Sequence, residues 1–414
     1  MDIQLRQGHL HGIVPAIASK SAAHRILICA ALSSSPTEII FKGMSNDILA
    51  TMQCLTAIGC TISTTSHGVL VHPPAQLLHI PHLDCLECGS TLRFLLPVAA
   101  ALYDDFSVTG HGRLAGRPLG ELARGMTEHG CELSTHTLPF RVYGRLHSGL
   151  YQIPGNVSSQ YISGLLFALP LLEGDSRIVL TSPLSSAAYV QMTIDALTRF
   201  GIDVRRTADG WHIRGGQKYC SPGRVLVEGD WSNAAVWLCA GALGGPVTVT
   251  GLDLNSKQAD LAIVELLGQL GASVFLGKDS VTVSRGSLRP LTVEVDQFPD
   301  LMPILAMLLA HVEGGSLITG AGRLRLKESD RLSAMCSALT QLGVPAIEGR
   351  DFLALQGGRI TAGTVDSAND HRIVMAAALA SIRTGLTITG AEAIEKSYPE
   401  FFRHFAALGG RIAN

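Results

Sequence analysis

Six strongly apolar segments, each beginning with small or polar residues, recur along the chain. They read SKSAAHRILICAAL, GSTLRFLLPVAAAL, VSSQYISGLLFALPLL, DWSNAAVWLCAGAL, FPDLMPILAMLLA and NDHRIVMAAALAS. Apolar residues occupy most positions rather than one face, so each segment predicts a helix that is buried on all sides. The Ser, Asp and Gly residues at their beginnings are typical of helix N-caps.

Two shorter patterns repeat with the same period. An amphipathic stretch ends in glycine and is followed by a short strand at Gly59, Gly130, Gly201, Gly271, Gly343 and Gly409, at intervals of about 70 residues. A strand runs into a turn at Gly43, Gly110, Gly251, Gly320 and Gly390. Glycine suits the left-handed residue that ends a helix, and β-branched residues suit strands. The chain therefore predicts six units with one plan: apolar helix, strand, amphipathic helix and strand pair.

The length and composition indicate two domains of three units each. The chain has 414 residues, of which 47% are hydrophobic and 16% charged, which is enough for more than one large core. The glycine-rich segment 215–230, GGQKYCSPGRVLVEGD, lies near the middle and is the expected crossover between the domains.

Charge and cysteine usage predict a cytoplasmic protein without nucleic-acid or membrane partners. The formal net charge is -2, so any anion site must come from a local cluster of basic residues. The nine cysteines are scattered, which favours reduced thiols. The beginning MDIQLRQGHL lacks the apolar core of a signal peptide, and no apolar run approaches the roughly 20 residues of a membrane span.

Basic residues recur at the starts of the apolar helices. Lys20, Arg25, Arg93 and Arg372 lie near helix starts, where the helix dipole disfavours cations unless an anion is bound. Further basic residues follow the strand turns: Arg117, Arg323, Arg325, Lys327, Arg331 and Lys396. The pattern predicts an anion-binding cleft, with Lys20 and Arg25 awaiting ligand phosphates and carboxylates rather than protein partners.

An ordered set of motifs resembles the enolpyruvyl transferases of the shikimate pathway. The motifs SKSAAHR, GSTLRF, GRP, SSQYISGLL, FPD, KESDR, DHR and KSYPEF cover nearly the whole chain. The resemblance implies an α/β fold of two domains, each an inside-out α/β barrel of three βαβαββ repeats with buried helices and an active site between the domains. One domain would comprise residues 1–16 and 226–414, and the other residues 17–225. The chain departs from the family pattern at Glu87 and Arg323, where better-known members carry Asn.

The resemblance also implies the reaction and its residues. The enolpyruvyl group of phosphoenolpyruvate would pass to the 5-hydroxyl of shikimate 3-phosphate through a tetrahedral intermediate, with release of phosphate. The implied shikimate 3-phosphate contacts are Lys20, Ser21, Arg25, Ser158, Ser159, Gln160, Ser186, Tyr189, Asp300 and Lys327. The implied phosphoenolpyruvate contacts are Lys20, Gly89, Arg117, Gln160, Arg331, His371, Arg372 and Lys396.

Proton transfer in this reaction needs a general base and a general acid. The resemblance favours Asp300 as the base toward the hydroxyl, with Lys20 and Glu328 moving the methylene proton. The cations of the cleft balance the substrate charge, so we expect neither a cofactor nor a metal, and a monomer acting on small molecules. Gly89 leaves room for the phosphoenolpyruvate-competing inhibitor glyphosate.

Three other interpretations of the sequence compete with this one. The related transferases acting on UDP-N-acetylglucosamine usually carry a cysteine just before the RP pair, and GHGRLAGRP has none. A non-catalytic paralogue would lack Asp300, Glu328, Lys20 or Lys396, and all four are present. His79, His82, Cys85 and Cys88 have the spacing of a zinc site, but the stretch contains Pro81 and runs directly into the GSTLRF helix.

Overall fold

The strands of the described residues form six four-stranded sheets. The computed structural model describes residues 1–77 and 80–413. The chain forms two compact units, unit 1 (Met1–Ser19 with Glu228–Asn414) and unit 2 (Lys20–Val227), so one unit is inserted into the other. Their boundaries lie within a few residues of those predicted.

The described residues of unit 2 form three sheets and six α-helices. The helices are α1 (Lys20–Ala31), α2 (Asn46–Ala57), α3 (Gly89–Leu102), α4 (Gly120–Thr127), α5 (Ser159–Ala168) and α6 (Ala187–Arg199). The first sheet has the order β14 (Arg224–Leu226), β3 (Thr37–Ile40), β5 (Gly68–His72) and β4 (Thr61–Thr65). The second is β6 (His82–Asp84), β7 (Asp105–Thr109), β9 (Phe140–Tyr143) and β8 (Glu132–Leu133), and the third is β10 (Leu150–Ile153), β11 (Ser176–Leu180), β13 (Gly210–Ile213) and β12 (Val204–Arg206).

Unit 1 repeats this plan. Its helices are α7 (Trp231–Leu243), α8 (Ile263–Leu270), α9 (Met302–Ala310), α10 (Arg331–Gln341), α11 (His371–Ala380) and α12 (Phe401–Ala407). One sheet is β2 (Gly12–Pro15), β15 (Val247–Thr250), β17 (Ser280–Ser284) and β16 (Ser273–Leu276). The others are β18 (Thr292–Glu294), β19 (Gly314–Thr319), β21 (Phe352–Gly357) and β20 (Ala346–Glu348), and β22 (Gly363–Asp366), β23 (Leu386–Thr389), β1 (Ile3–Arg6) and β24 (Arg411–Ile412).

Three sheets are completed by a strand from a distant part of the chain, which the sequence patterns did not predict. β14 pairs in parallel with β3, β2 pairs in parallel with β15, and β1 pairs antiparallel with β23. The two N-terminal strands thus belong to the last and the fourth repeats, and β14 returns to the first. Because the N-terminal strands belong to unit 1, the chain crosses into unit 2 after Ser19 and returns to unit 1 after Val227.

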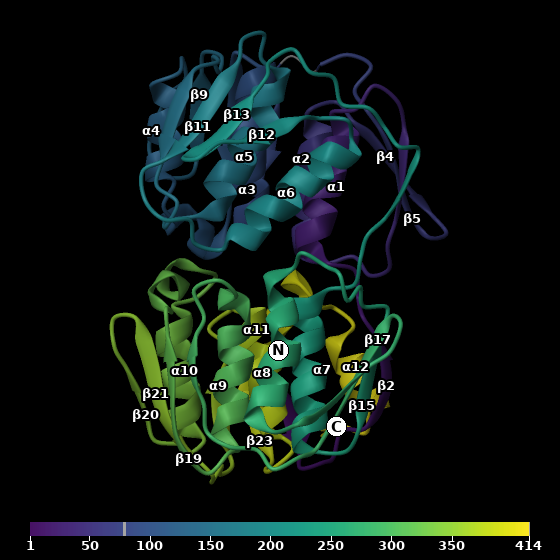
Figure 1. Cartoon of the computed structure of the whole chain (residues 1–414), viewed down its shortest axis with the longest axis vertical. Coiled ribbons are helices and arrows are strands. Elements are labelled where there is room, and N and C mark those ends of the chain that lie inside the picture. Colours follow the sequence, from purple (N-terminus) through teal and green to yellow (C-terminus); the bar gives the residue numbers. More distant parts are fainter. Residues whose placement is uncertain (78–79, 414) are drawn as a thin grey trace. The chain divides into compact units, whose positions relative to one another are not determined.

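The six apolar segments form the central helices of the two units, as predicted. Every residue of α9 and α11 is buried, and in Figure 1 the helices α7, α9 and α11 lie between the sheets of unit 1. All six glycines expected to end helices adopt a positive φ: Gly59, Gly130, Gly201, Gly271, Gly343 and Gly409. The predicted α/β fold with buried helices is confirmed, although the described strands of each unit form three separate sheets rather than one closed barrel.

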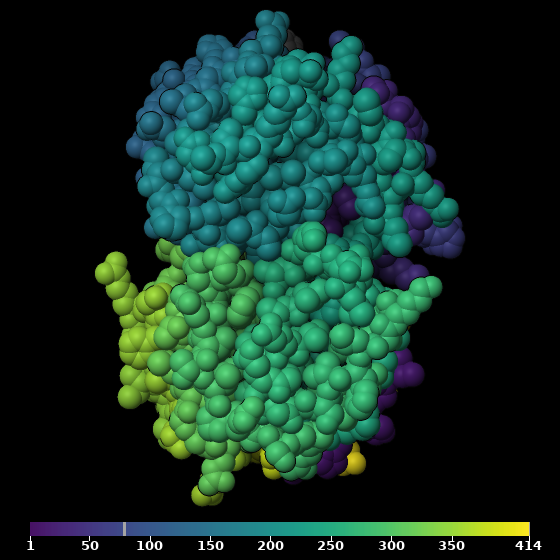
Figure 2. Space-filling view, viewed as in Figure 1, coloured from purple at the N-terminus to yellow at the C-terminus, as the bar shows by residue number. Residues whose placement is uncertain are grey.

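The N-terminal strands are an integral part of unit 1. In the space-filling view, purple atoms of the N-terminal residues lie among the green and yellow atoms of the C-terminal half (Figure 2).

Among the described residues, none of the helices has both the length and the apolarity needed to cross a bilayer.

Candidate active site

In unit 2, polar residues cap the apolar helices at the predicted starts. Ser158 caps α5, its hydroxyl accepting a hydrogen bond from the Gln160 amide at 3.3 Å. Cys88 caps α3, its sulfur accepting from the Thr91 amide at 3.4 Å. These caps fix the first turns, and therefore the positions of the basic side chains that these turns carry.

Lys20 and Arg25, at the start of α1, both have partners within the protein, which corrects the prediction that they wait for a ligand. Lys20 Nζ lies 2.7 Å from Asp47 Oδ2. Arg25 is buried and donates to the Thr193 hydroxyl at 2.8 Å and to the main-chain oxygens of Ser21 at 2.6 Å and Tyr189 at 2.8 Å. Its partners are neutral, and burial lowers the pKa of Arg25 to about 10. None of the carboxylates in the described part of the chain forms an ion pair with this guanidinium, so it keeps its positive charge, which suits anion binding.

A second basic group lies where α3 and α5 begin. Arg93 Nη1 donates to Gln160 Oε1 at 2.8 Å, and Gln160 Nε2 donates to the Ser90 hydroxyl at 2.8 Å. A Cβ at Gly89 would lie 2.7 Å from Arg117 Nη1 and 2.8 Å from Arg93 Nη1. Only glycine therefore allows both guanidinium groups to approach the first turn of α3.

Unit 2 gathers the other predicted residues around the same helix starts. Ser159 is buried in the first turn of α5. Ser186 precedes α6 in the left-handed conformation, with φ of 55°. Arg25 donates hydrogen bonds to the main-chain oxygens of both Ser21 and Tyr189, and Tyr189 lies in the first turn of α6.

In unit 1, Arg331 is the hub of a buried ion-pair network. It begins α10, and its three guanidinium nitrogens each lie 2.8 Å from a different carboxylate: Nη1 from Asp300, Nη2 from Glu328 and Nε from Asp370. Burial alone would lower the pKa of Arg331, but Asp370, Glu328 and Asp300 raise it above its usual value. The Arg331 guanidinium is thus held by three elements of the same unit.

Asp300 lies directly before α9, and several cationic side chains contact its carboxylate. In addition to Arg331, Lys327 Nζ lies 3.7 Å and Arg372 Nη2 3.3 Å from its carboxylate oxygens. Burial tends to raise the pKa of Asp300, but Lys327, Arg372 and Arg331 outweigh it and hold that pKa far below the usual value. Asp300 is therefore a carboxylate at neutral pH.

The remaining predicted residues of unit 1 lie at the start of α11 and, in the case of Lys396, at the end of the 3₁₀ turn that follows β23. Arg372 donates to the Ser232 hydroxyl at 2.6 Å and to its main-chain oxygen at 2.9 Å. His371 Nδ1 lies 3.8 Å from Asp370 Oδ1. Lys396 Nζ donates to the Asn369 oxygen at 2.7 Å. The structure therefore brings Asp300, Lys327, Glu328, Arg331 and Arg372 into one cluster.

The sequence interpretation missed the carboxylates that hold these cations. Asp370 caps α11 by accepting from the Arg372 amide at 2.9 Å, and it also binds Arg331. Its position directly before an apolar helix indicated only the cap. Asp47 lies in the first turn of α2, where an acidic residue is expected for its dipole. Neither position signals a distant basic partner.

The zinc set considered from sequence is not brought together in the described residues. The ring nitrogens of His82 lie 2.8 Å from the Ser107 hydroxyl and 3.1 Å from that of Thr109. Cys88 instead lies beside His24, with Sγ 3.8 Å from Nε2. His79 lies outside the described residues.

Comparison with solved structures identifies the class of this fold. The chain superposes on an EPSP synthase from Acinetobacter baumannii with a TM-score of 0.81 at 24% identity, covering 100% of both chains. It superposes on the enolpyruvyl transferase NikO from Streptomyces tendae with a TM-score of 0.79 at 19% identity, covering 100% of this chain and 98% of the other. The fold is thus that of the enolpyruvyl transferases.

The sequence comparisons define the family. A sequence model of EPSP synthase (3-phosphoshikimate 1-carboxyvinyltransferase) matches residues 5–405. A 3-phosphoshikimate 1-carboxyvinyltransferase from Clostridium kluyveri is 40% identical over 99% of this chain and 98% of its own length. Another from Clostridium acetobutylicum is 39% identical over 97% of this chain and 96% of its own length. The chain belongs to the EPSP synthase family, and it is an enzyme that catalyses the carboxyvinyl transfer for which the family is named.

Proposed function

We propose that this chain transfers the enolpyruvyl group of phosphoenolpyruvate to the 5-hydroxyl of shikimate 3-phosphate with the residues that gather at its helix starts. The observation that carries this assignment is the Asp300 carboxylate among Lys327, Arg331 and Arg372. The reaction needs both a base and cations for two anionic substrates. This cluster offers both in one unit.

Within unit 2, the neutral partners of Arg25 leave its charge available for shikimate 3-phosphate. Arg25 is held in place by a hydroxyl and two main-chain oxygens, so it is preorganised without being neutralised. Ser21, Ser158, Ser159, Gln160, Ser186 and Tyr189 complete the assignment in this unit. The hydroxyls and the amide supply directional hydrogen bonds, whereas the guanidinium supplies charge.

Within unit 1, the phosphate and carboxylate of phosphoenolpyruvate take Arg331, His371, Arg372 and Lys396. Two of these cations, Arg331 and Arg372, now bind Asp300, and Arg331 also binds Glu328. Each cation that turns toward the substrate weakens its hold on Asp300, so the pKa of Asp300 rises when phosphoenolpyruvate binds. Asp300 thereby becomes a stronger base when a substrate is present. Lys20, Gly89, Arg117 and Gln160 are assigned to the same substrate from unit 2.

The proposal assigns the proton steps to three of these residues. Asp300 accepts the proton of the 5-hydroxyl while the hydroxyl oxygen attacks the central carbon of phosphoenolpyruvate. Lys20 and Glu328 deliver a proton to the methylene carbon and later remove one, and phosphate leaves as the double bond re-forms. Glu328 Oε2 lies 2.8 Å from Arg331 Nη2, so the same guanidinium positions both carboxylates.

The decisive experiment measures phosphate release by the purified chain. Shikimate 3-phosphate and phosphoenolpyruvate should give turnover, and each alone should give none. Replacing shikimate 3-phosphate with UDP-N-acetylglucosamine is the matched control and should also give none. Release with the nucleotide sugar and none with shikimate 3-phosphate would overturn the proposal.

We further propose that the enzyme acts as a monomer in the cytoplasm. All nine cysteines are free thiols, and seven of them are buried, which is compatible with a reducing compartment. Light scattering on the purified chain should give the mass of one chain, 43.8 kDa. A mass twice this value would contradict the monomer.

A further inference from the structure

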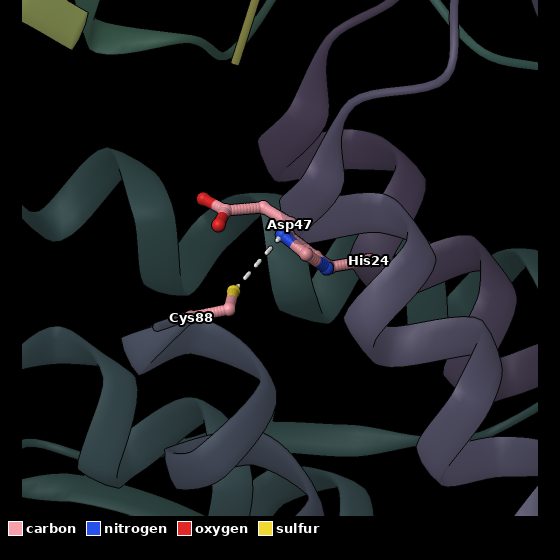
Figure 3. Close-up of side chains that lie close together, drawn as sticks. All are labelled: His24, Asp47 and Cys88. Atoms are coloured by element: carbon pink, nitrogen blue, oxygen red, sulfur yellow. Dashed lines mark hydrogen bonds between the residues drawn. The ribbon is translucent and has the colours of Figure 1, made fainter. Parts of the chain in front are cut away.

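Three elements of unit 2 place a histidine, a carboxylate and a thiol together near the start of α1. His24 belongs to α1, Asp47 to α2, and Cys88 caps α3 (Figure 3). Their ligand atoms all lie within 4.8 Å of one another, and all three residues are buried. We propose that these side chains form a binding site for a thiophilic divalent cation such as Zn²⁺.

The geometry is close to that of a tetrahedral zinc site. Cys88 Sγ and His24 Nε2 are 3.8 Å apart. Sulfur and nitrogen bound to one tetrahedral Zn²⁺, at about 2.3 Å and about 2.0 Å from the metal, lie roughly 3.5 Å apart. Cysteine, histidine and aspartate are the side chains that bind zinc, and three protein ligands leave the fourth position to water. The sulfur–nitrogen pair therefore needs a shift of only a few tenths of an ångström, and the Asp47 oxygen, within 4.8 Å of both atoms, moves inward to complete the site.

A second layer of contacts orients the histidine. His24 Nδ1 lies 2.7 Å from the Thr51 hydroxyl, which in turn lies 2.6 Å from the hydroxyl of Thr91. This contact turns Nε2 toward Cys88, as the outer partners of metal-binding histidines do. Burial, followed by Lys20 and Arg25, lowers the pKa of His24, so the ring is neutral, which is the form that binds metals.

The cysteine determines which metals the site favours. Burial raises the pKa of the Cys88 thiol to about 12, so a metal must displace the thiol proton when it binds. Metals that form strong thiolate bonds do this, whereas Mg²⁺ and Ca²⁺ prefer oxygen ligands. We therefore expect Zn²⁺ to bind and Mg²⁺ not to bind.

Occupation of this site has a consequence for Lys20. Asp47 Oδ2 now accepts from Lys20 Nζ at 2.7 Å, and a metal bound by Asp47 competes with that ammonium group for the carboxylate and repels it. The cation is thus an inhibitor rather than a cofactor. This consequence rests on the role proposed above for Lys20, but the binding site itself does not.

The first experiment measures binding without measuring activity. Co²⁺ is added to the metal-free full chain, and thiolate-to-cobalt charge-transfer absorption is recorded in the near ultraviolet. We expect one thiolate-bound Co²⁺ per chain, unchanged in Cys220→Ser and lost in Cys88→Ser. Cys220 is the matched control because it is an exposed free thiol. Absence of the band in the parent chain, or its loss in Cys220→Ser only, overturns the site.

Two further measurements cover a Cys88→Ser chain that fails to fold. Zinc X-ray absorption on the parent chain should show one sulfur ligand beside nitrogen and oxygen, and a shell without sulfur overturns the proposal. Thr51→Val should weaken zinc binding by about 10- to 100-fold, because it removes the partner that orients His24. An unchanged affinity would contradict that positioning.

The inhibitory consequence has a separate test. In the parent chain, Zn²⁺ should reduce phosphate release, and a chelator should restore it. Mg²⁺ at the same concentration should have no effect. Metal binding without inhibition would reject the role of Lys20 while leaving the site in place, so the two failures are distinguishable.

Discussion

The two units share one βαβαββ plan, yet they treat the charges at their helix starts in opposite ways. In unit 2, Arg25 is held by a hydroxyl and main-chain oxygens. In unit 1, the equally buried Arg331 is held by three carboxylates. The first arrangement keeps a net positive charge for an anionic ligand, and the second keeps carboxylates that can exchange protons. One fold thus surrounds a buried arginine with neutral acceptors in one unit and with carboxylates in the other.

The largest expected effect comes from replacing Asp300, the proposed base of unit 1. Asp300→Asn keeps the shape of the side chain but removes its basicity, so we expect kcat to fall by about 10²- to 10⁴-fold. Binding of shikimate 3-phosphate, measured by calorimetry, should persist. The matched variant in unit 2 is Asp47→Asn, which alters the partner of Lys20 and should lower kcat much less. Equal losses in both variants would erase the proposed division between the units.

A second prediction compares the two buried arginines through stability. Arg331→Met leaves Asp300, Glu328 and Asp370 without their shared cation, and should lower the free energy of unfolding by about 3–5 kcal/mol. Arg25→Met leaves only neutral acceptors unsatisfied and should lower it by about 1–3 kcal/mol. The two side chains are 1% and 3% exposed, so burial does not account for the difference. Denaturant unfolding measures both values, and a larger loss in Arg25→Met would reverse the comparison.

Much of this architecture could be predicted from sequence because it is encoded locally. The apolar helices and the glycines that end the amphipathic helices depend on residues that are neighbours in the chain, and the structure confirms them. The pairing of β1, β2 and β14 could not be predicted, since their partner strands are distant in sequence. A short β-branched run can pair with many strands equally well.

The site was predicted in part for the same reason. Arg372 was found because a basic residue at a helix start conflicts with the helix dipole, and Arg331 was found because it lies in a basic run after a strand turn. Asp370 and Asp47 satisfy that dipole, so nothing in their local sequence marks them as ion-pair partners. The misinterpretation of Lys20 follows from this, because its partner Asp47 was hidden in an ordinary helix start.

Acid should weaken unit 1 through a histidine rather than through its carboxylates. Burial lowers the pKa of His311 to about 4, with Arg383 lowering it further against a hydrogen bond to Met307. The unfolded chain binds this proton near pH 6.5 and the folded chain does not, so stability falls as pH drops from 6.5 toward 4. Between pH 7 and pH 5 this contributes a loss of about 2 kcal/mol.

The variant His311→Asn isolates this contribution. Asparagine preserves a donor toward the Met307 oxygen, which His311 Nδ1 now approaches to 2.8 Å, but it does not titrate. The parent chain should therefore lose about 2 kcal/mol more than the variant between pH 7 and pH 5. Asp300 gives little loss in this range, because both the pKa of an aspartate in the unfolded chain, about 3.9, and its lower pKa in the folded chain lie below pH 5. If the free energy of unfolding falls with pH equally in the two chains, a group other than His311 causes the loss of stability.

The smallest effect comes from two ion pairs that occupy similar places in the two units. In unit 2, His111 Nε2 lies 3.1 Å from Asp84 Oδ2, with side chains 59% and 38% exposed. In unit 1, Arg323 Nη2 lies 2.9 Å from Asp296 Oδ1, with side chains 21% and 28% exposed, and also donates to the Asp296 main-chain oxygen at 2.7 Å. Both pairs tie the end of the first strand of a repeat to the turn after the second.

Exposure decides how much each pair contributes. His111→Ala should change the free energy of unfolding by less than about 0.5 kcal/mol, because water and salt screen an exposed pair. Arg323→Ala should lower it by about 1 kcal/mol, since it removes a more buried charge and a main-chain hydrogen bond. High salt should narrow the effect of His111→Ala further and leave most of that of Arg323→Ala. Equal and salt-sensitive changes in the free energy of unfolding would mean that the greater burial of the Arg323 pair does not strengthen it. The ion pairs of the two units would then differ only at the helix starts.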